Sequence, residues 1–257
     1  MLRAVIWLIS AIIAVLLTIL AFLPAAWMSV LLENQTGGRF SLGDPQGTLW
    51  QGSAFLGGAP GANAAVAPLL PGRFSWRLSR LVLVGQVDAE LSNPEALSRP
   101  VRIDGGWNAW AVSPAQITLP AERLVALGAP LNTLQPSGRM TLSWQPLRMA
   151  REGRAIAITG AMQLALDDIA SRLSPIKPLG AYRLALDWHG QQAQLRLTST
   201  HGPLLLTGSG RLEQGRLRFS GRAQAEAGQE ERLANLLNLL GQRRSEGGKD
   251  YISLEFK

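Results

Sequence analysis

The sequence predicts a mainly β protein, in which an N-terminal transmembrane helix precedes a twisted antiparallel β-sheet domain with two short helices. Two observations predict this fold class. The run from Ala4 to Leu23 contains no charge, no proline and no glycine, and about 20 apolar helical residues cross a bilayer core. From Arg39 onward, apolar and polar residues alternate with a period of two, which is typical of strands with one buried face.

The uncharged run divides the chain into a cytoplasmic N-terminus with a transmembrane anchor, residues 1–33, and a periplasmic β-rich domain, residues 34–257. Arg3 precedes the run and Glu33 is the first charge after it. Because positive charge stays on the cytoplasmic side, we expect a single-pass inner-membrane protein with its N-terminus inside. A cleaved signal peptide is the alternative, but its apolar region usually has about 7–15 residues and ends at a small-residue site. Pro24 and the residues after it make a poor cleavage site.

The first half of the β-rich domain contains eight candidate strands. A short helix at 28–32 comes before them, and Gly37 and Gly38 end it. The segment 57–71 is rich in glycine, alanine and proline, which predicts a loop with one short strand. The candidate strands are 48–55, 73–78, 81–91, 101–103, 106–112, 116–119, 138–144 and 154–166.

The second half has the clearest alternation. Residues 180–225 show apolar side chains at every second position in successive runs, with glycine between runs. This pattern predicts a four-stranded antiparallel meander. The segment 251–256 is expected to add a last strand.

Two helices interrupt the predicted sheet. Pro120 opens the first, Ala121–Leu127, and Gly128 ends it, as capping preferences favour. The second is Glu230–Leu240, where leucines recur at i, i+3, i+4 and i+7 and form one apolar stripe. The stripe consists of Leu233, Leu236, Leu237 and Leu240.

The sequence carries little that favours catalysis. It contains no cysteine, which excludes a disulfide scaffold, a cysteine zinc site and a thiol nucleophile. His189 and His201 both precede glycine at turn positions. Asp167 and Asp168 are the only acidic pair in the sheet region, and capping of a single helical turn through Leu173 explains them. We therefore expect no catalytic residue, no metal, no cofactor and no enzyme activity.

The net charge of +7 does not indicate a nucleic-acid partner. A nucleic-acid binder clusters its basic residues, whereas the arginines here are spread singly and only Arg243 and Arg244 are adjacent. A solvated basic surface explains the charge. Attraction to anionic lipid headgroups or to an acidic partner is the alternative.

The segment from Gly47 to Ala54, GTLWQGSA, is the most distinctive one. We expect a strand in which Trp50 is buried and the flanking glycines allow close packing. Core packing explains most of the eight tryptophans. Trp107 and Trp110 are three apart, so a strand places them on opposite faces, and the alternative for this pair is that one of them is exposed for a partner. The candidate structural or interaction residues are Gly47, Thr48, Trp50, Gly52, Trp76 and Trp144, together with the four leucines of the stripe.

The order of four elements resembles the family of type II secretion system protein N. They are the Leu-Pro-Ala exit of the apolar run at Leu23, the GTLW element, the Trp76 strand after Pro71, and the segment 127–144 that ends at Trp144. The resemblance implies an inner-membrane accessory subunit with a structural or assembly role in the export of folded periplasmic proteins. It also implies that the partners are other subunits of the system, and it brings no catalytic residues.

The predicted meander supports a second reading. It resembles the strand repeats of AsmA-like lipid carriers, in which a long curved sheet has one apolar face. This resemblance implies a periplasmic lipid-binding module with an apolar β groove and phospholipid as a possible ligand. An uncovered apolar trough would favour the carrier over the scaffold, since monomers rarely expose large apolar areas.

Overall fold

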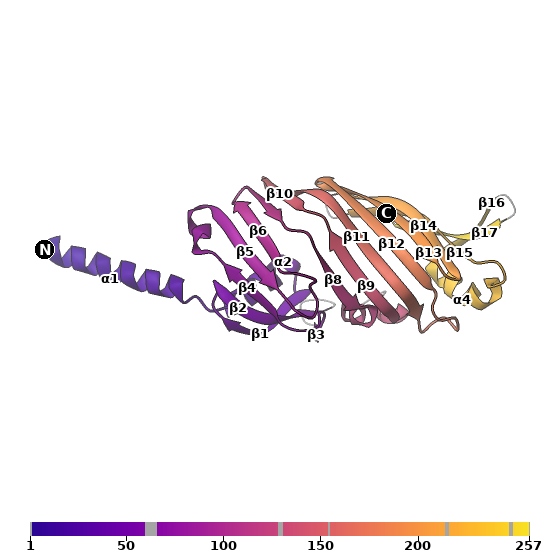
Figure 1. The fold of residues 1–257 in the computed structure, drawn as a ribbon, viewed down its shortest axis with the longest axis horizontal. Helices are drawn as coiled ribbons and strands as arrows, with labels where there is room; N and C mark the ends of the chain where they lie inside the picture. Colours follow the sequence, from indigo (N-terminus) through magenta and orange to yellow (C-terminus); the bar gives the residue numbers. More distant parts are fainter. Residues whose placement is uncertain are drawn as a thin grey trace.

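The computed structural model describes residues 2–59, 66–127, 131–153, 155–213, 216–246 and 249–256. Over these residues the protein is mainly β, and its strands form one antiparallel sheet. Figure 1 shows that the sheet runs along the long axis of the molecule, with α1 projecting from one end and β16–β17 at the other. The expected fold class is confirmed for the sheet.

The strands and helices have the following bounds. The strands are β1 (Phe40–Gly47), β2 (Gln51–Gly58), β3 (Ala67–Pro68), β4 (Phe74–Leu78), β5 (Gln86–Ser92), β6 (Val101–Gly106), β7 (Ala109–Val112), β8 (Ala115–Pro120), β9 (Pro136–Trp144), β10 (Leu147–Glu152), β11 (Ala155–Ser171), β12 (Gly180–Gly190), β13 (Gln192–His201), β14 (Leu204–Glu213), β15 (Arg216–Ala225), β16 (Gln242–Glu246) and β17 (Lys249–Phe256). The helices are α1 (Leu2–Ala21), α2 (Ala26–Thr36), α3 (Leu131–Leu134) and α4 (Glu230–Leu240), with 3-10 turns η1 (Arg80–Val84) and η2 (Ala121–Leu127).

The strands follow one another in space almost in chain order. β1 pairs with β2, and β2 pairs with both β3 and β4. From β4 each strand pairs with the next as far as β7, which pairs with β10 while β8 pairs with β9. Both β9 and β10 pair with β11. From β11 each strand pairs with the next as far as β15. β15 then pairs with β17, and β17 also pairs with β16.

Prolines explain why two long strands are interrupted. Pro114 separates β7 from β8 and Pro146 separates β9 from β10. Proline has no N–H to donate to a ladder, so each break kinks its strand. Three strands, β1, β10 and β16, were not predicted from the sequence.

The predicted meander at 180–225 is confirmed as β12 to β15, and the last strand is confirmed as β17. The expected strand at 81–91 is wrong in its first part, because η1 occupies Arg80–Val84 and β5 begins at Gln86. Gly85 follows η1 with φ +97°, a conformation that suits glycine, and turns the chain into β5.

The expected helical turn after Asp167 is also wrong. Asp167 and Asp168 lie within β11, at a register shift between Leu166 and Ile169. Asp168 has φ +54°, and Asp167 Oδ1 forms an ion pair with Arg183 Nη1 at 2.8 Å. The expected helix end at Gly128, the expected strand start at Arg154, and residues 60–65 of the expected loop lie outside the described residues.

The chain before the sheet is helical. α1 covers Leu2–Ala21, and α2 ends at Gly37 with φ +61°, as the two glycines predict. Among the residues that the structure describes, no helix combines the length and the apolar character needed to cross a membrane. The transmembrane anchor therefore stays a prediction.

The core lies on one face of the sheet in two main parts. In the first part, buried residues of β4 and β6 to β10 pack together, among them Phe74, Val101 and Met140. In the second part, Leu233 and Leu236 of α4 pack against Leu204 and the segment that precedes β12. α4 is therefore part of the core of the last strands (Figure 1).

Candidate functional site

The turn between β1 and β2 contacts the end of α1. The Trp50 side chain is 6% exposed, and its Nε1 donates a hydrogen bond of 2.7 Å to the carbonyl oxygen of Leu20. The amide of Leu49 donates to the carbonyl oxygen of Leu23 at 2.8 Å, and the amide of Ala25 donates to that of Gly47 at 3.1 Å. The last carbonyls of a helix lack hydrogen-bond donors within it. The Trp50 indole donates to one of them from the turn between β1 and β2.

Two glycines make the turn possible. Gly47 has φ +86°. At Gly52 an added Cβ would lie 2.5 Å from Cζ2 of Trp76 and 2.6 Å from the carbonyl oxygen of Gln46. Any side chain at Gly52 would displace the Trp76 indole, whose Nε1 donates to the carbonyl oxygen of Leu49 at 3.1 Å.

The expected strand at 48–55 therefore begins at Gln51, and Trp50 lies in the turn before it. Gly47, Thr48, Trp50, Gly52 and Trp76 come together in one place, which we call the hairpin joint. The carbonyl of Trp50 also accepts from the amide of Leu78 at 2.7 Å. The joint therefore connects α1 to three strands, β1, β2 and β4.

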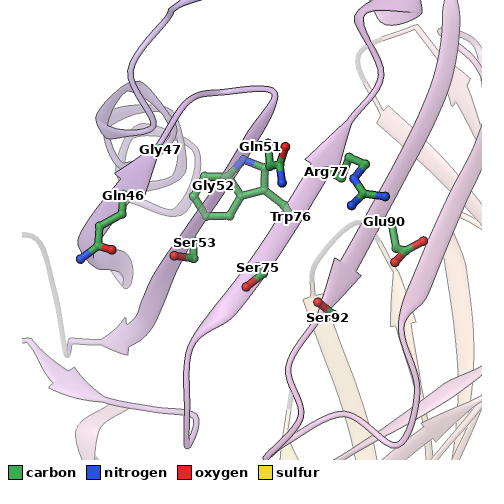
Figure 2. A pocket seen from close by; sticks show the side chains of 10 residues that line it. All are labelled: Gln46, Gly47, Gln51, Gly52, Ser53, Ser75, Trp76, Arg77, Glu90 and Ser92. Carbon is green, nitrogen blue, oxygen red and sulfur yellow. The ribbon is translucent and has the colours of Figure 1, made fainter.

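A shallow polar cavity lies beside the hairpin joint (Figure 2). Its volume is about 350 Å³. Figure 2 shows the Trp76 ring reaching across toward Gly52, with Arg77 on the same strand, β4, and Glu90 on β5. The lining residues are Gln46, Gly47, Gln51, Gly52, Ser53, Ser75, Trp76, Arg77, Glu90 and Ser92. This lining combines hydrogen-bond donors and acceptors with the apolar face of the Trp76 ring.

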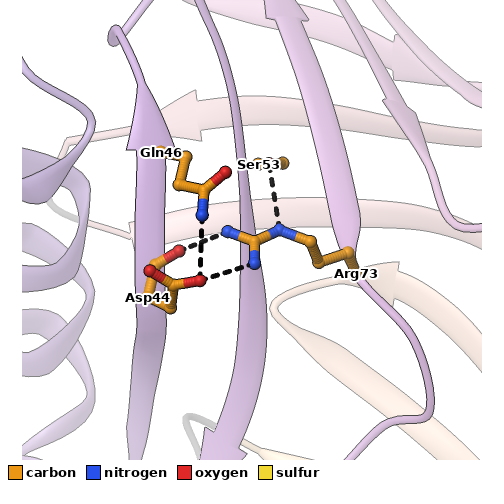
Figure 3. A network of polar contacts seen from close by, with 4 residues as sticks. All are labelled: Asp44, Gln46, Ser53 and Arg73. Atoms are coloured by element: carbon orange, nitrogen blue, oxygen red, sulfur yellow. Dashed lines mark hydrogen bonds and ion pairs between the residues drawn. The ribbon is translucent and has the colours of Figure 1, made fainter.

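An ion pair fixes the irregular part of β1 (Figure 3). Arg73 Nη1 lies 2.7 Å from Asp44 Oδ2, and Arg73 Nε donates to Ser53 Oγ at 3.1 Å. Asp44 has φ +47°, at a register shift between Gly43 and Gln46. The hydrogen bond from Arg73 is the main cause that lowers the pKa of the Asp44 carboxyl below its usual value. The Asp44-Pro45 pair, a turn signal, was the only sequence feature that could have indicated this bulge.

Trp144 lies apart from the hairpin joint. It is the last residue of β9 and packs, half-buried, against the first core. Its Nε1 donates to the carbonyl oxygen of Ser113 at 2.8 Å, beside the kink at Pro114. Trp144 therefore stabilises the place where the two broken strands pair.

Trp107 and Trp110 lie in different environments, but the expected strand at 106–112 is wrong in its first part, because Trp107 lies in the turn between β6 and β7. Trp110 is half-buried and packs against the first core. Trp107 is exposed, and its Nε1 donates to the carbonyl oxygen of Val82 at 2.6 Å.

The four leucines of α4 divide into two pairs. Leu233 and Leu236 are buried, whereas Leu237 and Leu240 are half-buried and pack against Ala223, Ile252 and Leu254. A cavity of about 630 Å³ lies between α4 and strands β15 and β17. Its lining includes apolar side chains such as Leu205 and Leu237 and polar ones such as Glu226, Glu230 and Tyr251.

The described residues do not assemble a metal site, since no group of three or more His, Cys, Asp or Glu side chains among them is placed to hold an ion. The candidate functional features of the described residues are therefore the hairpin joint, the cavity beside it, and the cavity beside α4.

A comparison with protein families places this geometry in context. The family described as type II secretion system (T2SS), protein N, matches residues 38–250. No curated protein and no solved structure matches the chain.

Proposed function

We propose a structural role for this chain, from the premise that it belongs to the type II secretion system protein N family. The match begins at residue 38 and includes every strand from β1 to β16 and the first two residues of β17. The chain is therefore a component of a type II secretion system. In our proposal it is a non-catalytic accessory subunit that contributes to the assembly of the machine and to export of folded periplasmic proteins.

The proposed location is the inner membrane, with the N-terminus in the cytoplasm and residues 34–257 in the periplasm. The support is the uncharged run from Ala4 to Leu23, with Arg3 before it. In addition, α1 exposes large apolar side chains along its length, among them Trp7, Val15 and Ile19. Apolar side chains in such a row are stable only where something other than water surrounds them.

The observation that carries the structural role is the hairpin joint. A mobile carrier can hang from its anchor on a flexible linker, whereas a scaffold must hold its domain at a fixed angle. Here the exit of α1 is bound by Trp50 and by backbone hydrogen bonds from Leu49 and Ala25. The joint thus favours a domain with a fixed orientation toward its anchor.

The edges of the sheet are the proposed sites of contact with other subunits. β1 and β16 are the end strands, and exposed strand edges can accept a further strand. At β1 the irregularity around Asp44 and Pro45 divides the pairing with β2 into Phe40–Gly43 and the two residues Gln46 and Gly47. At β16 five residues pair with β17, and three of them are charged: Arg243, Arg244 and Glu246. We therefore expect short strand additions or packing on the sheet faces.

Deletion of the chain in its host tests this role. We expect loss of type II substrates from the medium and their accumulation in the periplasm, with restoration by the wild-type chain. Photo-crosslinking residues placed at Ser41 and at Ser245 should capture other subunits of the system, whereas Ser209 on the meander serves as a control. Normal secretion under several growth conditions, with no crosslink at either edge, would contradict the proposal.

A second candidate function, lipid binding, is favoured by one observation. Apolar side chains form continuous rows across the meander, such as Trp144, Met162, Leu186 and Leu195 on four neighbouring strands. Several of these side chains are only half-buried, and the cavity beside α4 adds apolar lining. Such a surface suits an acyl chain.

Mass spectrometry separates the two candidates. The full chain is purified in detergent, its bound lipid is extracted, and the amount is compared with that of another single-span protein handled in the same way. Stoichiometric phospholipid above the control would favour the lipid-binding module. Phospholipid at the control level, together with a secretion defect, would favour the scaffold.

A further inference from the structure

The hairpin between β4 and β5 ends in an exposed apolar tip. This tip is η1, with the sequence RLVLV, and Leu81, Leu83 and Val84 are 49%, 48% and 79% exposed. Trp107, 55% exposed, joins them from the turn between β6 and β7 and is fixed by its hydrogen bond to Val82. Single exposed apolar residues are normal, but four large ones gathered at one tip mark an interaction site.

The fold itself does not require these side chains. A β-hairpin can close with a two-residue turn, whereas this connection inserts five apolar or basic residues between Ser79 and Gly85. η1 has no buried residue. The apolar character of the tip is therefore better explained by something that covers it than by packing within the chain.

The tip lies at the end of the sheet from which α1 projects. Trp50 contacts Leu20 of α1 through its indole, and its carbonyl accepts from Leu78, which is two residues before η1. Figure 1 shows the connection between β4 and β5 at the same end of the sheet as α1. Whatever surrounds the exposed apolar side chains of α1 therefore borders η1 as well.

We propose that the tip formed by η1 and Trp107 inserts into the interfacial layer of the bilayer that anchors α1. This inference rests on the membrane anchoring in the proposed function. Leucine and valine side chains would lie at the level where headgroups meet acyl chains, about 5–10 Å into that boundary, and the indole of Trp107 suits the same layer. With α1, the tip gives the domain two attachment points, which restrict its tilt over the membrane.

The charges around the tip define the kind of lipid surface. Arg80 lies in η1 and Arg151 lines the cavity beside Trp107, while Asp88 and Asp104 face each other on the adjoining strands β5 and β6. Because basic and acidic groups balance, the contact is apolar and does not select anionic lipids. A bilayer of phosphatidylcholine alone should be enough.

The absence of cysteine allows a direct test on the full chain. Val84→Cys is labelled with an environment-sensitive fluorophore, and the protein is reconstituted in phosphatidylcholine vesicles that carry a nitroxide quencher at a shallow or a deep acyl position. Trp7→Cys reports insertion of α1. Ser209→Cys, on the exposed face of β14, is the matched control for a water-exposed site.

We expect a blue-shifted emission at position 84 and stronger quenching by the shallow nitroxide than by the deep one, with no change at position 209. If position 7 is quenched while position 84 behaves like position 209, the tip proposal is overturned and the anchor stands. If neither position 7 nor position 84 is quenched, the anchoring itself fails.

A second variant guards against an effect of the probe. Leu83→Asp with Val84→Asp changes only exposed side chains, so the chain should stay folded by circular dichroism. With the fluorophore at Asn108→Cys, next to Trp107, this double substitution should abolish the quenching by the shallow nitroxide. Unchanged quenching at position 108 would contradict insertion of the tip.

Discussion

Trp50 and Leu20 are 30 residues apart in the chain, and the indole Nε1 of Trp50 donates a 2.7 Å hydrogen bond to the carbonyl oxygen of Leu20. A helix commonly ends with a glycine that lets the backbone satisfy its last carbonyls. α1 ends before Phe22, Leu23 and Pro24, so no such glycine follows it. Trp50, in the turn between β1 and β2, takes over part of that role, which makes the end of α1 dependent on the folding of the β1–β2 hairpin.

The hairpin joint predicts a graded series at position 50. Trp50→Ala should lower the free energy of unfolding by about 3–5 kcal/mol, because a buried aromatic side chain is lost. Trp50→Phe keeps most of the packing and loses the hydrogen bond to Leu20, for a loss of about 1 kcal/mol. Urea unfolding of the full chain in detergent, followed by circular dichroism, measures both. Trp27→Phe, at an exposed site, is the control, and equal effects at positions 50 and 27 would contradict the joint.

Gly52 should tolerate no side chain. In Gly52→Ala the new Cβ meets the carbonyl oxygens of Gln46 and Thr48 at 2.6 and 2.9 Å as well as the Trp76 ring, and backbone atoms cannot move aside cheaply. We expect a loss of about 1–3 kcal/mol from overpacking. Gly43→Ala in the same hairpin is the matched control, since its nearest atom lies at 3.8 Å. The prediction fails if the two variants have the same urea midpoint.

The regular part of the fold was accessible from the sequence. In the meander, residues such as Leu184 and Leu186 face the apolar side while Arg183 and Asp187 do not, and strands with one buried face must alternate in this way. The stripe on α4 is similarly informative, because Leu233 and Leu236 do face the core. The antiparallel sheet and the covering helix both follow from periodicity.

The irregular part was not accessible in this way. β1 reads FSLGDPQG, which has no alternation, and it is a strand because β2 pairs with it and Arg73 holds Asp44. Leu81, Leu83 and Val84 resemble a buried strand in composition, yet they are exposed at η1. Periodicity describes which residues are apolar but not what covers them. The contact between Trp50 and Leu20 is tertiary, so no local pattern could indicate it.

The ion pair at Asp44 predicts a dependence on pH. The pKa of this carboxyl is lowered from its ordinary value of 3.8, mainly by the hydrogen bond from Arg73. A lowered pKa in the folded state means that the pair stabilises the fold above the ordinary pKa and that this stabilisation is lost as the pH falls through the lowered value. The effect should be small, since the pair is at the surface.

The test for the ion pair compares urea midpoints at about pH 7 with those at a series of acidic pH values below about 4, the ordinary pKa of Asp. Asp44→Asn should have a lower urea midpoint than the wild type at neutral pH. Its midpoint should also fall less on acidification than that of the wild type. Asp187→Asn is the control, because Asp187 is exposed and makes no ion pair within the described residues. An identical acid response in wild type and Asp44→Asn would show that the pair contributes nothing.

The two sides of α4 should respond differently to substitution. Leu233 is fully buried between α4 and the end of the sheet, so Leu233→Ala should cost about 2–5 kcal/mol through lost packing and a cavity. Leu239 is exposed, and Leu239→Ala should change the free energy of unfolding by less than about 0.5 kcal/mol.

Leu237→Asp brings a charge to the wall of the cavity beside α4, where an unpaired charge is unfavourable. It should loosen α4 and increase the binding of a hydrophobic dye, whereas a folded Leu237→Asp variant with unchanged dye binding would mean that α4 does not cover an apolar surface.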